Sequence, residues 1–262
     1  MLSDMPDIGS FDGVRIRYER TGTTDPKRPP VVCVHGFASS AHINWLRPRI
    51  VDRLAEDGRD VVVLDLRGHG GSDKPHDTAS YEGEALVRDV VAVLDEVGAD
   101  RYDLVGYSMG AMTSLRLALG DARVRSVVAG GMGSRVFEDR GPEDSVADAL
   151  EEPDRAAITR PELRRYRDFV ELTGGDRFAL AALRRAGGMP SLTREEAGSI
   201  SVPVLVVVGD ADDAVGSPSE LADVLPGGRL EVVGGTHLNA INNPAFANAI
   251  AAFLRSVDDG TA

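Results

Sequence analysis

The 262-residue sequence has a single cysteine, Cys33, so no disulfide can form within the chain. Cys33 lies in the apolar run VVCVH, which favours a buried structural thiol over a reactive one. No apolar stretch is long enough to span a membrane. The first ten residues, MLSDMPDIGS, lack the basic start and the apolar run of a secretory signal. From these absences we expect a cytoplasmic protein with no membrane partner.

The sequence also lacks an excess of basic residues: 29 Lys and Arg stand against 42 Asp and Glu, which gives a formal net charge of −13. A nucleic-acid-binding protein would need a basic face, so we expect no nucleic acid partner. There is no His-x-x-x-His sequence and no cluster of cysteines and histidines, so we expect neither a metal ion nor another cofactor. The expected partner is a small-molecule substrate, bound by a monomer or a small homo-oligomer.

Hydrophobic residues make up 42% of the chain, and many occur in short β-branched runs that alternate with helical patterns. Residues 14–19 alternate between apolar and polar, as a half-exposed strand does. Residues 81–97 repeat apolar side chains along one helical face. Continuous apolar runs, which suit strands covered on both faces, occupy residues 30–36, 60–66, 102–108, 124–131, 202–209 and 229–235. This alternation predicts an α/β fold, with a mostly parallel sheet and helices on both faces.

The alternation stops between residues 132 and 200. This segment has three helical patterns, EDSVADALEE, PELRRYRDFVEL and DRFALAALRRAGG, and no strand pattern between them. The simplest interpretation is a helical cap inserted into the sheet domain. We therefore expect a core made of residues 1–131 and 201–262, with a cap of residues 132–200 over the carboxyl edge of the sheet.

The stretch LVGYSMGAM, residues 104–112, places Ser108 between two glycines at a junction of a strand pattern and a helix pattern. The sequence G-x-S-x-G at such a junction is typical of the nucleophile elbow, a sharp turn that exposes the serine hydroxyl. Gly106 and Gly110 would give the clearance that the turn requires. A glycine-rich turn with an incidental serine is the alternative, and the strand–turn–helix context favours the nucleophile.

Four stretches together resemble the α/β-hydrolase fold family over essentially the whole chain. VCVHGFASS is similar to the family's His-Gly oxyanion loop, and LDLRGHGGSDKP to its next strand and loop. GYSMG is similar to the elbow, and GDADDAV with GGTHLNAINNP to the loops that carry the acid and the base. The order of serine, acid and histidine is also that of the family. The resemblance implies an α/β-hydrolase fold and a hydrolase with a Ser-Asp-His triad.

The resemblance also assigns a base and an acid. Among the five histidines, His237 lies between the last strand pattern and the last helix pattern, where the family places its catalytic base. His35 and His69 fall in loop-shaping motifs, so we interpret them as structural. In GDADD the family's spacing selects Asp212 as the acid, with Asp213 as the close competitor. The carboxylate would fix the tautomer of His237 and stabilise its protonated form.

A tetrahedral oxyanion needs hydrogen-bond donors that are already in place. The elbow rule assigns the backbone N–H of Met109, and the resemblance assigns that of Phe37. In the loop DLRGHGGSD we expect a turn scaffold with a buried pair of Asp65 and Arg67. The bulky apolar side chains expected around the substrate are Trp45, Met132, Tyr166, Phe169, Phe178 and Leu238. Trp45 would either line this pocket or pack beneath it.

The residue at the elbow limits the classes of reaction that the protein could catalyse. Haloalkane dehalogenases and epoxide hydrolases of this family carry aspartate there, so Ser108 favours an acyl-enzyme route. We expect a carboxylesterase that cleaves small, apolar esters. A lactonase, thioesterase, carbon–carbon bond hydrolase or cofactor-free perhydrolase is the alternative, and a ligand-binding protein without activity is a further one. Arginines 164, 165, 184 and 185 would attract an anionic substrate, but basic side chains on helices are usually solvated.

Overall fold

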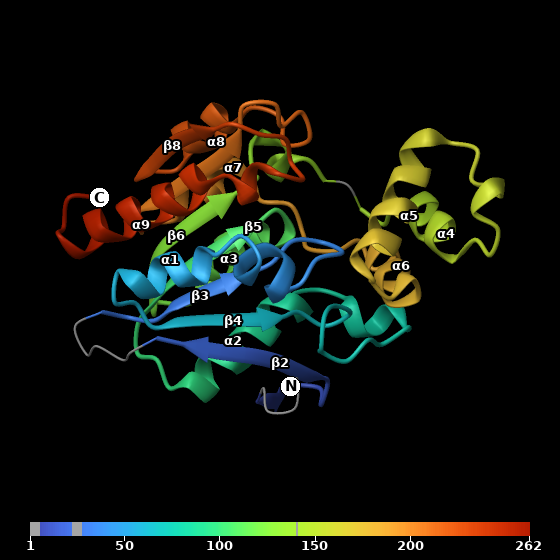
Figure 1. The fold of residues 1–262 in the computed structure, drawn as a ribbon, viewed down its shortest axis with the longest axis horizontal. Coiled ribbons are helices and arrows are strands. Elements are labelled where there is room, and N and C mark those ends of the chain that lie inside the picture. Colours follow the sequence, from blue (N-terminus) through green and yellow to red (C-terminus); the bar gives the residue numbers. More distant parts are fainter. Residues whose placement is uncertain (1–5, 23–27, 140) are drawn as a thin grey trace.

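A computed structural model describes residues 6–22, 28–139 and 141–262. The first five residues, which belong to the segment searched for a secretory signal, lie outside the described part. The described chain forms an eight-stranded sheet in the spatial order β1-β2-β4-β3-β5-β6-β7-β8 (Figure 1). Its strands are β1 (Asp7–Gly9), β2 (Arg15–Thr21), β3 (Val31–Val34), β4 (Val61–Asp65), β5 (Tyr102–Tyr107), β6 (Val124–Gly130), β7 (Val204–Gly209) and β8 (Gly228–Val233).

The sheet is mostly parallel. Strands β3 to β8 run parallel to one another, while β2 pairs antiparallel with β4, and β1 antiparallel with β2. Every residue of β3, β4, β5 and β7 is buried, because helices cover both faces and β-branched side chains fill the space between. The sequence patterns located every strand except β1, which at three residues is too short to show a pattern.

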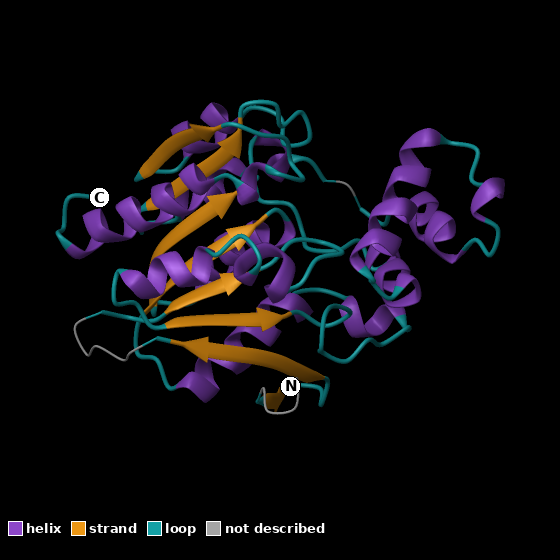
Figure 2. Ribbon diagram, in the orientation of Figure 1, coloured by secondary structure: helices purple, strands orange, loops and turns teal. Residues whose placement is uncertain are grey.

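Helices lie on both faces of the sheet, as the alternating patterns predicted (Figure 2). One face packs against α1 and α9, which contribute the fully buried Leu54 and Phe246. The other face packs against α2, α3 and α8, which contribute Leu115 and Leu221. The bounds of these helices are α1 (Ile50–Glu56), α2 (Ala85–Val97), α3 (Met109–Gly120), α8 (Pro218–Val224) and α9 (Pro244–Asp258).

Three helices between β6 and β7 stand apart from the sheet domain, beyond the carboxyl ends of the strands (Figure 1). We call them the cap helices: α4 (Asp144–Glu151), α5 (Pro161–Thr173) and α6 (Arg177–Arg185). They coincide with the three helical patterns of the insertion. Leu150, Val170 and Leu180 have no exposed surface, because the cap helices pack on one another.

The two ends of the insertion lie on the sheet domain instead. Both η3 (Ser134–Phe137) and α7 (Arg194–Ser199) contact α8, and α7 also contacts α3. The cap helices thus occupy only the middle of the insertion, and the assignment of all of residues 132–200 to the cap stays a prediction. The other short helical segments are η1 (His42–Leu46), η2 (Thr78–Tyr81), η4 (Arg155–Ala157) and η5 (Ala240–Asn242).

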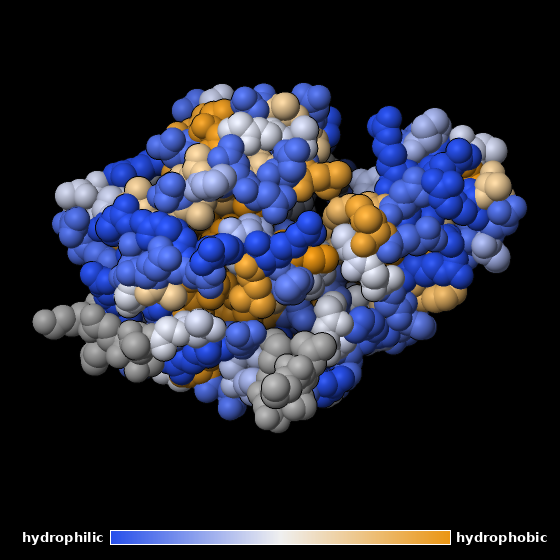
Figure 3. Space-filling model, viewed as in Figure 1, coloured by the Kyte–Doolittle hydropathy of each residue, from blue (hydrophilic) through white to orange (hydrophobic). Residues whose placement is uncertain are grey.

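The face shown in Figure 3 is largely hydrophilic, and apolar residues gather on it beside the gap between the sheet domain and the cap helices. Exposed large hydrophobic side chains include Phe178 at the start of α6 and Leu238 next to the last helix. Among the described helices, none combines the length and the hydropathy that a membrane crossing requires.

Arg67 forms a buried ion pair in the loop after β4, but the expected partner, Asp65, is wrong. The guanidinium donates to both carboxylate oxygens of Asp89 on α2 (2.6 and 2.7 Å) and to Asp12 (2.7 Å). Burial acts against the charge, yet these hydrogen bonds hold the pKa of Arg67 above its ordinary value. Asp65 instead accepts from the backbone N–H of Ala41 (2.8 Å), so it links two loops without a cation.

Candidate active site

Ser108 lies at the carboxyl end of β5, immediately before α3. Its backbone has φ 52° and ψ −113°, outside the regions that L-residues favour. The Ser108 N–H donates to Gly130 O (2.8 Å), and Ser108 O accepts from Ala111 N–H (2.9 Å). A strained residue that its neighbours hold in place at a strand end is typical of a functional position.

The two glycines of the elbow are required by close packing. A Cβ on Gly110 would lie 2.0 Å from Val34 O of β3, and a Cβ on Gly106 would lie 2.3 Å from Gly110 O. Neither glycine has a positive φ, so clearance and not backbone conformation explains both. This contact brings the start of α3 directly against the central strands and leaves the Ser108 side chain at their carboxyl edge.

Three side chains from separate loops form a hydrogen-bonded chain at this edge. His237 Nε2 lies 3.0 Å from Ser108 Oγ, and His237 Nδ1 lies 2.9 Å from Asp212 Oδ2. The ionised Asp212 only accepts, so Nδ1 carries the proton and Nε2 presents its lone pair to the serine hydroxyl. An imidazole in this geometry can remove a proton from a serine. The structure thus brings together the three residues predicted as a triad, and their catalytic roles stay predictions.

Asp212, and not its neighbour Asp213, faces the histidine. The Asp212 side chain has no exposed surface, and its second carboxylate oxygen accepts from Ala214 N–H (3.1 Å). Asp213 is exposed to solvent. One oxygen on the imidazole and one on a backbone N–H hold the Asp212 carboxylate in a single orientation.

The loop that carries His237 is held by hydrogen bonds to its own backbone. Asp210 Oδ1 accepts from Gly235 N–H (2.8 Å), and Asn239 Oδ1 accepts from Thr236 N–H (2.6 Å). The first bond joins the acid loop to the histidine loop, so the spacing between the two loops is fixed as well.

Tyr107 also fixes the histidine loop, and the sequence patterns did not single it out. Its hydroxyl donates to the backbone oxygen of His237 (2.6 Å). Burial, with a contribution from the charge of Asp212, raises the pKa of Tyr107, so the hydroxyl keeps its proton. Tyr107 occupies a variable position of G-x-S-x-G, and therefore the motif carried no signal for this contact.

The two N–H groups expected to bind an oxyanion come from loops that meet at the elbow. Met109 is the first residue of α3, where a helix leaves N–H groups without an intrahelical partner. Gly36, just before Phe37, packs on the elbow: a Cβ there would lie 3.2 Å from Tyr107 O and 3.4 Å from Ser108 Cβ. Within the described part of the chain, neither the Phe37 N–H nor the Met109 N–H donates a hydrogen bond. Their role as oxyanion donors stays a prediction.

His35 and His69 support the oxyanion loop as neutral side chains. His69 Nε2 accepts from Ala38 N–H (3.1 Å), and its Nδ1–H donates to Arg67 O (2.9 Å). His35 Nε2 accepts from Leu66 N–H (3.0 Å). Burial lowers the pKa of both histidines, that of His69 to about 3, so Nε2 stays an acceptor in each. These bonds between loops agree with the structural role expected for both.

The structure spreads out the residues that we expected around the substrate. Tyr166 of α5 lies beside Phe37, with ring centroids 6.5 Å apart. Leu238 follows His237 in the chain and is 63% exposed. Phe178 lies beside His76, with ring centroids 5.6 Å apart, and is 40% exposed.

Trp45 lies in a packed core, and its expected place beside or beneath the substrate pocket stays a prediction. It has no exposed surface and belongs to the core beneath α1 and α9, as do Ile50 and Leu54. The large apolar ring gains more from this burial than it would at the rim of a site. Met132 and Phe169 are half-buried and pack against a cluster that includes residues of α2, α3 and the cap helices. A pocket role for these two residues stays a prediction.

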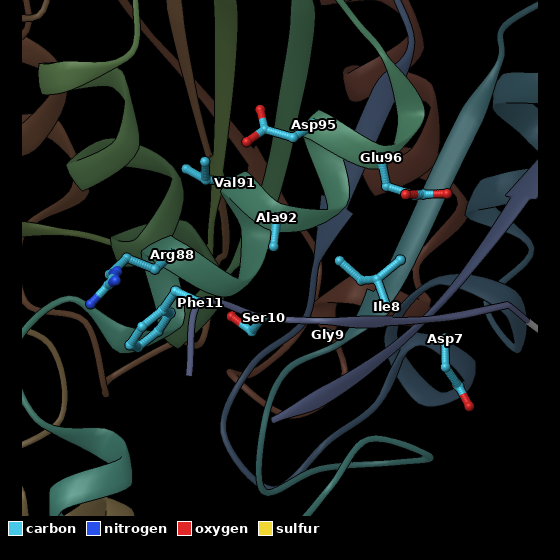
Figure 4. A pocket seen from close by; sticks show the side chains of 10 residues that line it. All are labelled: Asp7, Ile8, Gly9, Ser10, Phe11, Arg88, Val91, Ala92, Asp95 and Glu96. Atoms are coloured by element: carbon cyan, nitrogen blue, oxygen red, sulfur yellow. The ribbon is translucent and has the colours of Figure 1, made fainter. Parts of the chain in front are cut away.

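A cleft of about 730 Å³ lies between β1 and α2, where its lining includes Asp7, Arg88 and Glu96 (Figure 4). Strand β1 is at the edge of the sheet, four strands from β5, so this cleft is separate from Ser108. In residues 6–22, 28–139 and 141–262, no three His, Cys, Asp or Glu side chains are arranged to hold a metal ion.

Known proteins share this architecture. A family model described as alpha/beta hydrolase fold matches residues 29–143. Epoxide hydrolase A of Mycobacterium tuberculosis is 38% identical over 101 residues, which are 38% of this chain and 30% of that protein. The chain thus spans less than a third of the length of this relative.

Two solved structures are similar to nearly the whole chain. The enol-lactonase from Burkholderia xenovorans LB400 is 24% identical with a TM-score of 0.77, over 95% of this chain and 100% of that one. Est816, described as an N-acyl homoserine lactone degrading enzyme, is 27% identical with a TM-score of 0.70, over 96% and 99%. The parallel sheet, the strained serine turn and these similarities agree: the chain has the α/β-hydrolase fold.

Proposed function

We propose that the protein is a serine hydrolase that cleaves carboxylic esters of small, apolar substrates through an acyl-enzyme. The observation that carries this proposal is the hydrogen-bonded chain from Ser108 through His237 to Asp212. The tautomer that this chain imposes on His237 leaves a basic nitrogen 3.0 Å from the serine hydroxyl. A serine hydroxyl needs such a base, because it is a weak nucleophile while it keeps its proton.

In the first half of the reaction, Ser108 Oγ attacks the carbonyl carbon while His237 Nε2 takes the hydroxyl proton. Asp212 holds the Nδ1–H and stabilises the imidazolium. The N–H groups of Phe37 and Met109 receive the negative charge that develops on the carbonyl oxygen. His237 then passes its proton to the leaving oxygen, the alcohol departs, and Ser108 remains acylated.

In the second half, water takes the place of the alcohol. His237 Nε2 removes a proton from the water, whose oxygen attacks the acyl carbon. The same two N–H groups receive the charge of the second tetrahedral intermediate. When this intermediate collapses, the carboxylic acid leaves and the proton returns from His237 to Ser108 Oγ.

The similarity to an epoxide hydrolase does not make an epoxide the better substrate. Attack of Ser108 on an epoxide would produce an ether, which has no carbonyl carbon for water to attack. Attack on an ester produces an acyl-enzyme, which the same residues hydrolyse. The serine at the elbow therefore favours the ester.

A lactone is the second candidate substrate. The similarity to Est816 extends over 96% of this chain, and that protein is described as degrading a lactone. A lactone is a cyclic ester, so the same acylation step opens its ring and leaves the alcohol attached to the acyl group. Release then needs only the water step.

The test compares wild type with Ser108→Ala on short p-nitrophenyl esters and on a panel of lactones. We expect Ser108→Ala to lower kcat by about 10⁴-fold or more. Ser219→Ala is the control, because Ser219 is exposed on α8 and should leave kcat unchanged. A fluorophosphonate should label wild type at Ser108 and leave Ser108→Ala unlabelled. Equal ester hydrolysis by wild type and Ser108→Ala would refute the proposal, and turnover of lactones alone would favour the second candidate.

A further inference from the structure

Arg184 links the cap to the loop that carries a proposed oxyanion donor. It lies on α6, and its guanidinium carbon is 3.9 Å from the centroid of the Phe37 ring and 5.5 Å from that of Tyr166. A cation over the face of an aromatic ring is attracted by the ring's quadrupole, and the attraction grows when the pair is shielded from water. Only 20% of the Arg184 side chain is exposed, so water screens this contact weakly.

Arg184 is itself held in place by α4. Its Nη1 donates to Glu143 Oε2 (2.9 Å), and the Glu143 N–H donates to Arg184 O (3.0 Å). The two bonds join the start of α4 to the end of α6. These bonds therefore fix the position of the guanidinium that contacts Phe37.

Phe37 precedes a strained residue. Ala38 has a φ of 53°, a left-handed conformation that alanine rarely adopts. On the backbone side, Ala38 N–H donates to His69 Nε2 (3.1 Å). On the side-chain side, the Phe37 ring lies edge-on to the rings of His69 and Tyr166, and Arg184 covers its face. Contacts therefore hold Phe37 and Ala38 on both the backbone side and the side-chain side.

We propose that Arg184 is a positioning residue that anchors the Phe37 ring, so that the Phe37 N–H stays directed at the developing oxyanion. This inference rests on the proposed function, in which that N–H binds the carbonyl oxygen. It gives the cap a part in stabilising the transition state, in addition to contacts with the substrate. Loss of Arg184 should then slow the chemical step more than it weakens substrate binding.

Direct binding of an anionic substrate by Arg184 is the competing role. Arg184 Nη1 is already engaged by Glu143, and Nε is buried without a hydrogen-bond partner among the described residues. A substrate carboxylate would have to pair with the other donors of this guanidinium, and Nε is shielded from solvent. The geometry therefore favours the anchoring role, and the two roles differ in whether KM or kcat changes.

The test uses Arg184→Met, which keeps much of the side-chain length and removes the charge. Arg185→Met is the matched control, because Arg185 lies one residue further along α6 and pairs with Asp148 and Glu151 of the cap. We expect Arg184→Met to lower kcat about 10-fold, less than full loss of an oxyanion donor, with KM changed less than about 2-fold. Arg184→Lys keeps a cation and should retain more of kcat. Arg185→Met should keep the wild-type kcat and KM.

Two further measurements separate anchoring from a general effect on the cap. A boronic acid that forms a tetrahedral adduct with Ser108 should bind Arg184→Met more weakly, in proportion to the fall in kcat/KM. In a Phe37→Leu background, Arg184→Met should have little additional effect, because the ring that it anchors is gone. Melting temperatures of all variants show whether each is folded. If Arg184→Met does not fold, Arg184→Lys replaces it, and its effect on kcat with and without Phe37→Leu decides whether Arg184 anchors the ring.

The results that would overturn this inference differ from those that would refute the proposed function. If wild type hydrolyses esters in a Ser108-dependent manner but Arg184→Met matches Arg185→Met, the anchoring role is wrong. A rise in KM with unchanged kcat would overturn it in favour of substrate binding by Arg184. Ester hydrolysis that does not depend on Ser108 would instead refute the proposed function itself.

Discussion

The carboxyl edge of the sheet and the cap helices are held together in different ways. At the sheet edge, glycines pack against backbone atoms and buried polar groups hold the loops, as at Gly110 and Asp212. On the cap helices, exposed ion pairs are frequent, such as Arg155 with Asp168, whose side chains are 49% and 43% exposed. An exposed pair contributes at most about 1 kcal/mol to stability. The sheet edge therefore leaves little room for change, whereas much of the cap surface should accept substitution.

This difference matches a division between chemistry and selectivity in the proposed function. The reacting groups come from loops of the sheet domain, where a displacement of about 1 Å would disrupt the chain from Ser108 to Asp212 and cost about 100-fold in rate. The cap helices contribute Tyr166 beside Phe37, and the face of the cap seen in Figure 3 is mostly hydrophilic. Arg184 crosses this division, because it lies on the cap and contacts the loop of the sheet domain.

The largest expected effect is on the acid of the triad. Asp212→Asn removes the charge that stabilises protonated His237 and can reverse its tautomer, so we expect kcat to fall by about 10⁴-fold. Asp213→Asn makes the same chemical change at the exposed neighbour and should leave kcat within about 2-fold of wild type. Steady-state kinetics on a p-nitrophenyl ester measure both. Similar losses in the two variants would remove the distinction that the structure draws between the adjacent carboxylates.

The next effect concerns the elbow glycine. Gly110→Ala would place a Cβ 2.0 Å from Val34 O, and we expect a loss of several kcal/mol of unfolding free energy, or no soluble protein. Gly120→Ala is the control at the other end of α3, where a Cβ meets no atom within 4 Å. It should be neutral or stabilise the protein by up to about 1 kcal/mol, because alanine favours helix over glycine. A Gly110→Ala protein with wild-type stability in denaturant titrations would contradict the close contact.

The sequence predicted the turns at the sheet edge better than the packing between distant elements, for a physical reason. Ser108 and Asp212 each follow a strand in a turn that only certain residues can form, so a local pattern indicates both the turn and the side chain. Trp45 and the partner of Arg67 depend on which elements pack together across the fold. The core around Trp45 is completed by α9, about 200 residues later in the chain, and no local pattern records that contact. The strands and helices could be predicted from local patterns too. A strand buried on both faces has a continuous apolar run, and a helix buried on one face has apolar residues at a regular spacing.

Acid should weaken the sheet edge through His69. Burial lowers the pKa of the folded histidine to about 3, below the ordinary value of 6.5, so the unfolded chain takes up the proton first as pH falls. The stabilisation is complete above pH 6.5 and is lost progressively between pH 6.5 and about 3. From pH 7 to about pH 4.5, this one group should reduce the unfolding free energy by roughly 2 to 3 kcal/mol.

A pair of histidine variants isolates this contribution. His69→Gln keeps an acceptor for Ala38 N–H but does not titrate, so its unfolding free energy should fall less between the two pH values than that of wild type. His42→Gln changes an exposed histidine of η1 and should keep the wild-type dependence. Urea titrations at both pH values give the change in unfolding free energy for each of the three proteins. The same acid dependence in wild type and His69→Gln would show that the loop does not hold this histidine neutral.

The smallest effect is expected on the outer surface of the cap. Leu172 of α5 is 85% exposed, so Leu172→Ala should change the unfolding free energy by no more than about 0.5 kcal/mol. Leu180 of α6 has no exposed surface, and the same substitution there should cost about 2 to 5 kcal/mol, because it leaves a cavity between the cap helices. Thermal unfolding of the two variants compares the same Leu→Ala substitution at an exposed and at a buried position of the cap helices. A large loss from Leu172→Ala would mean that its exposed side chain is covered in solution, whereas equally small losses would mean that the cap lacks a packed interior of its own.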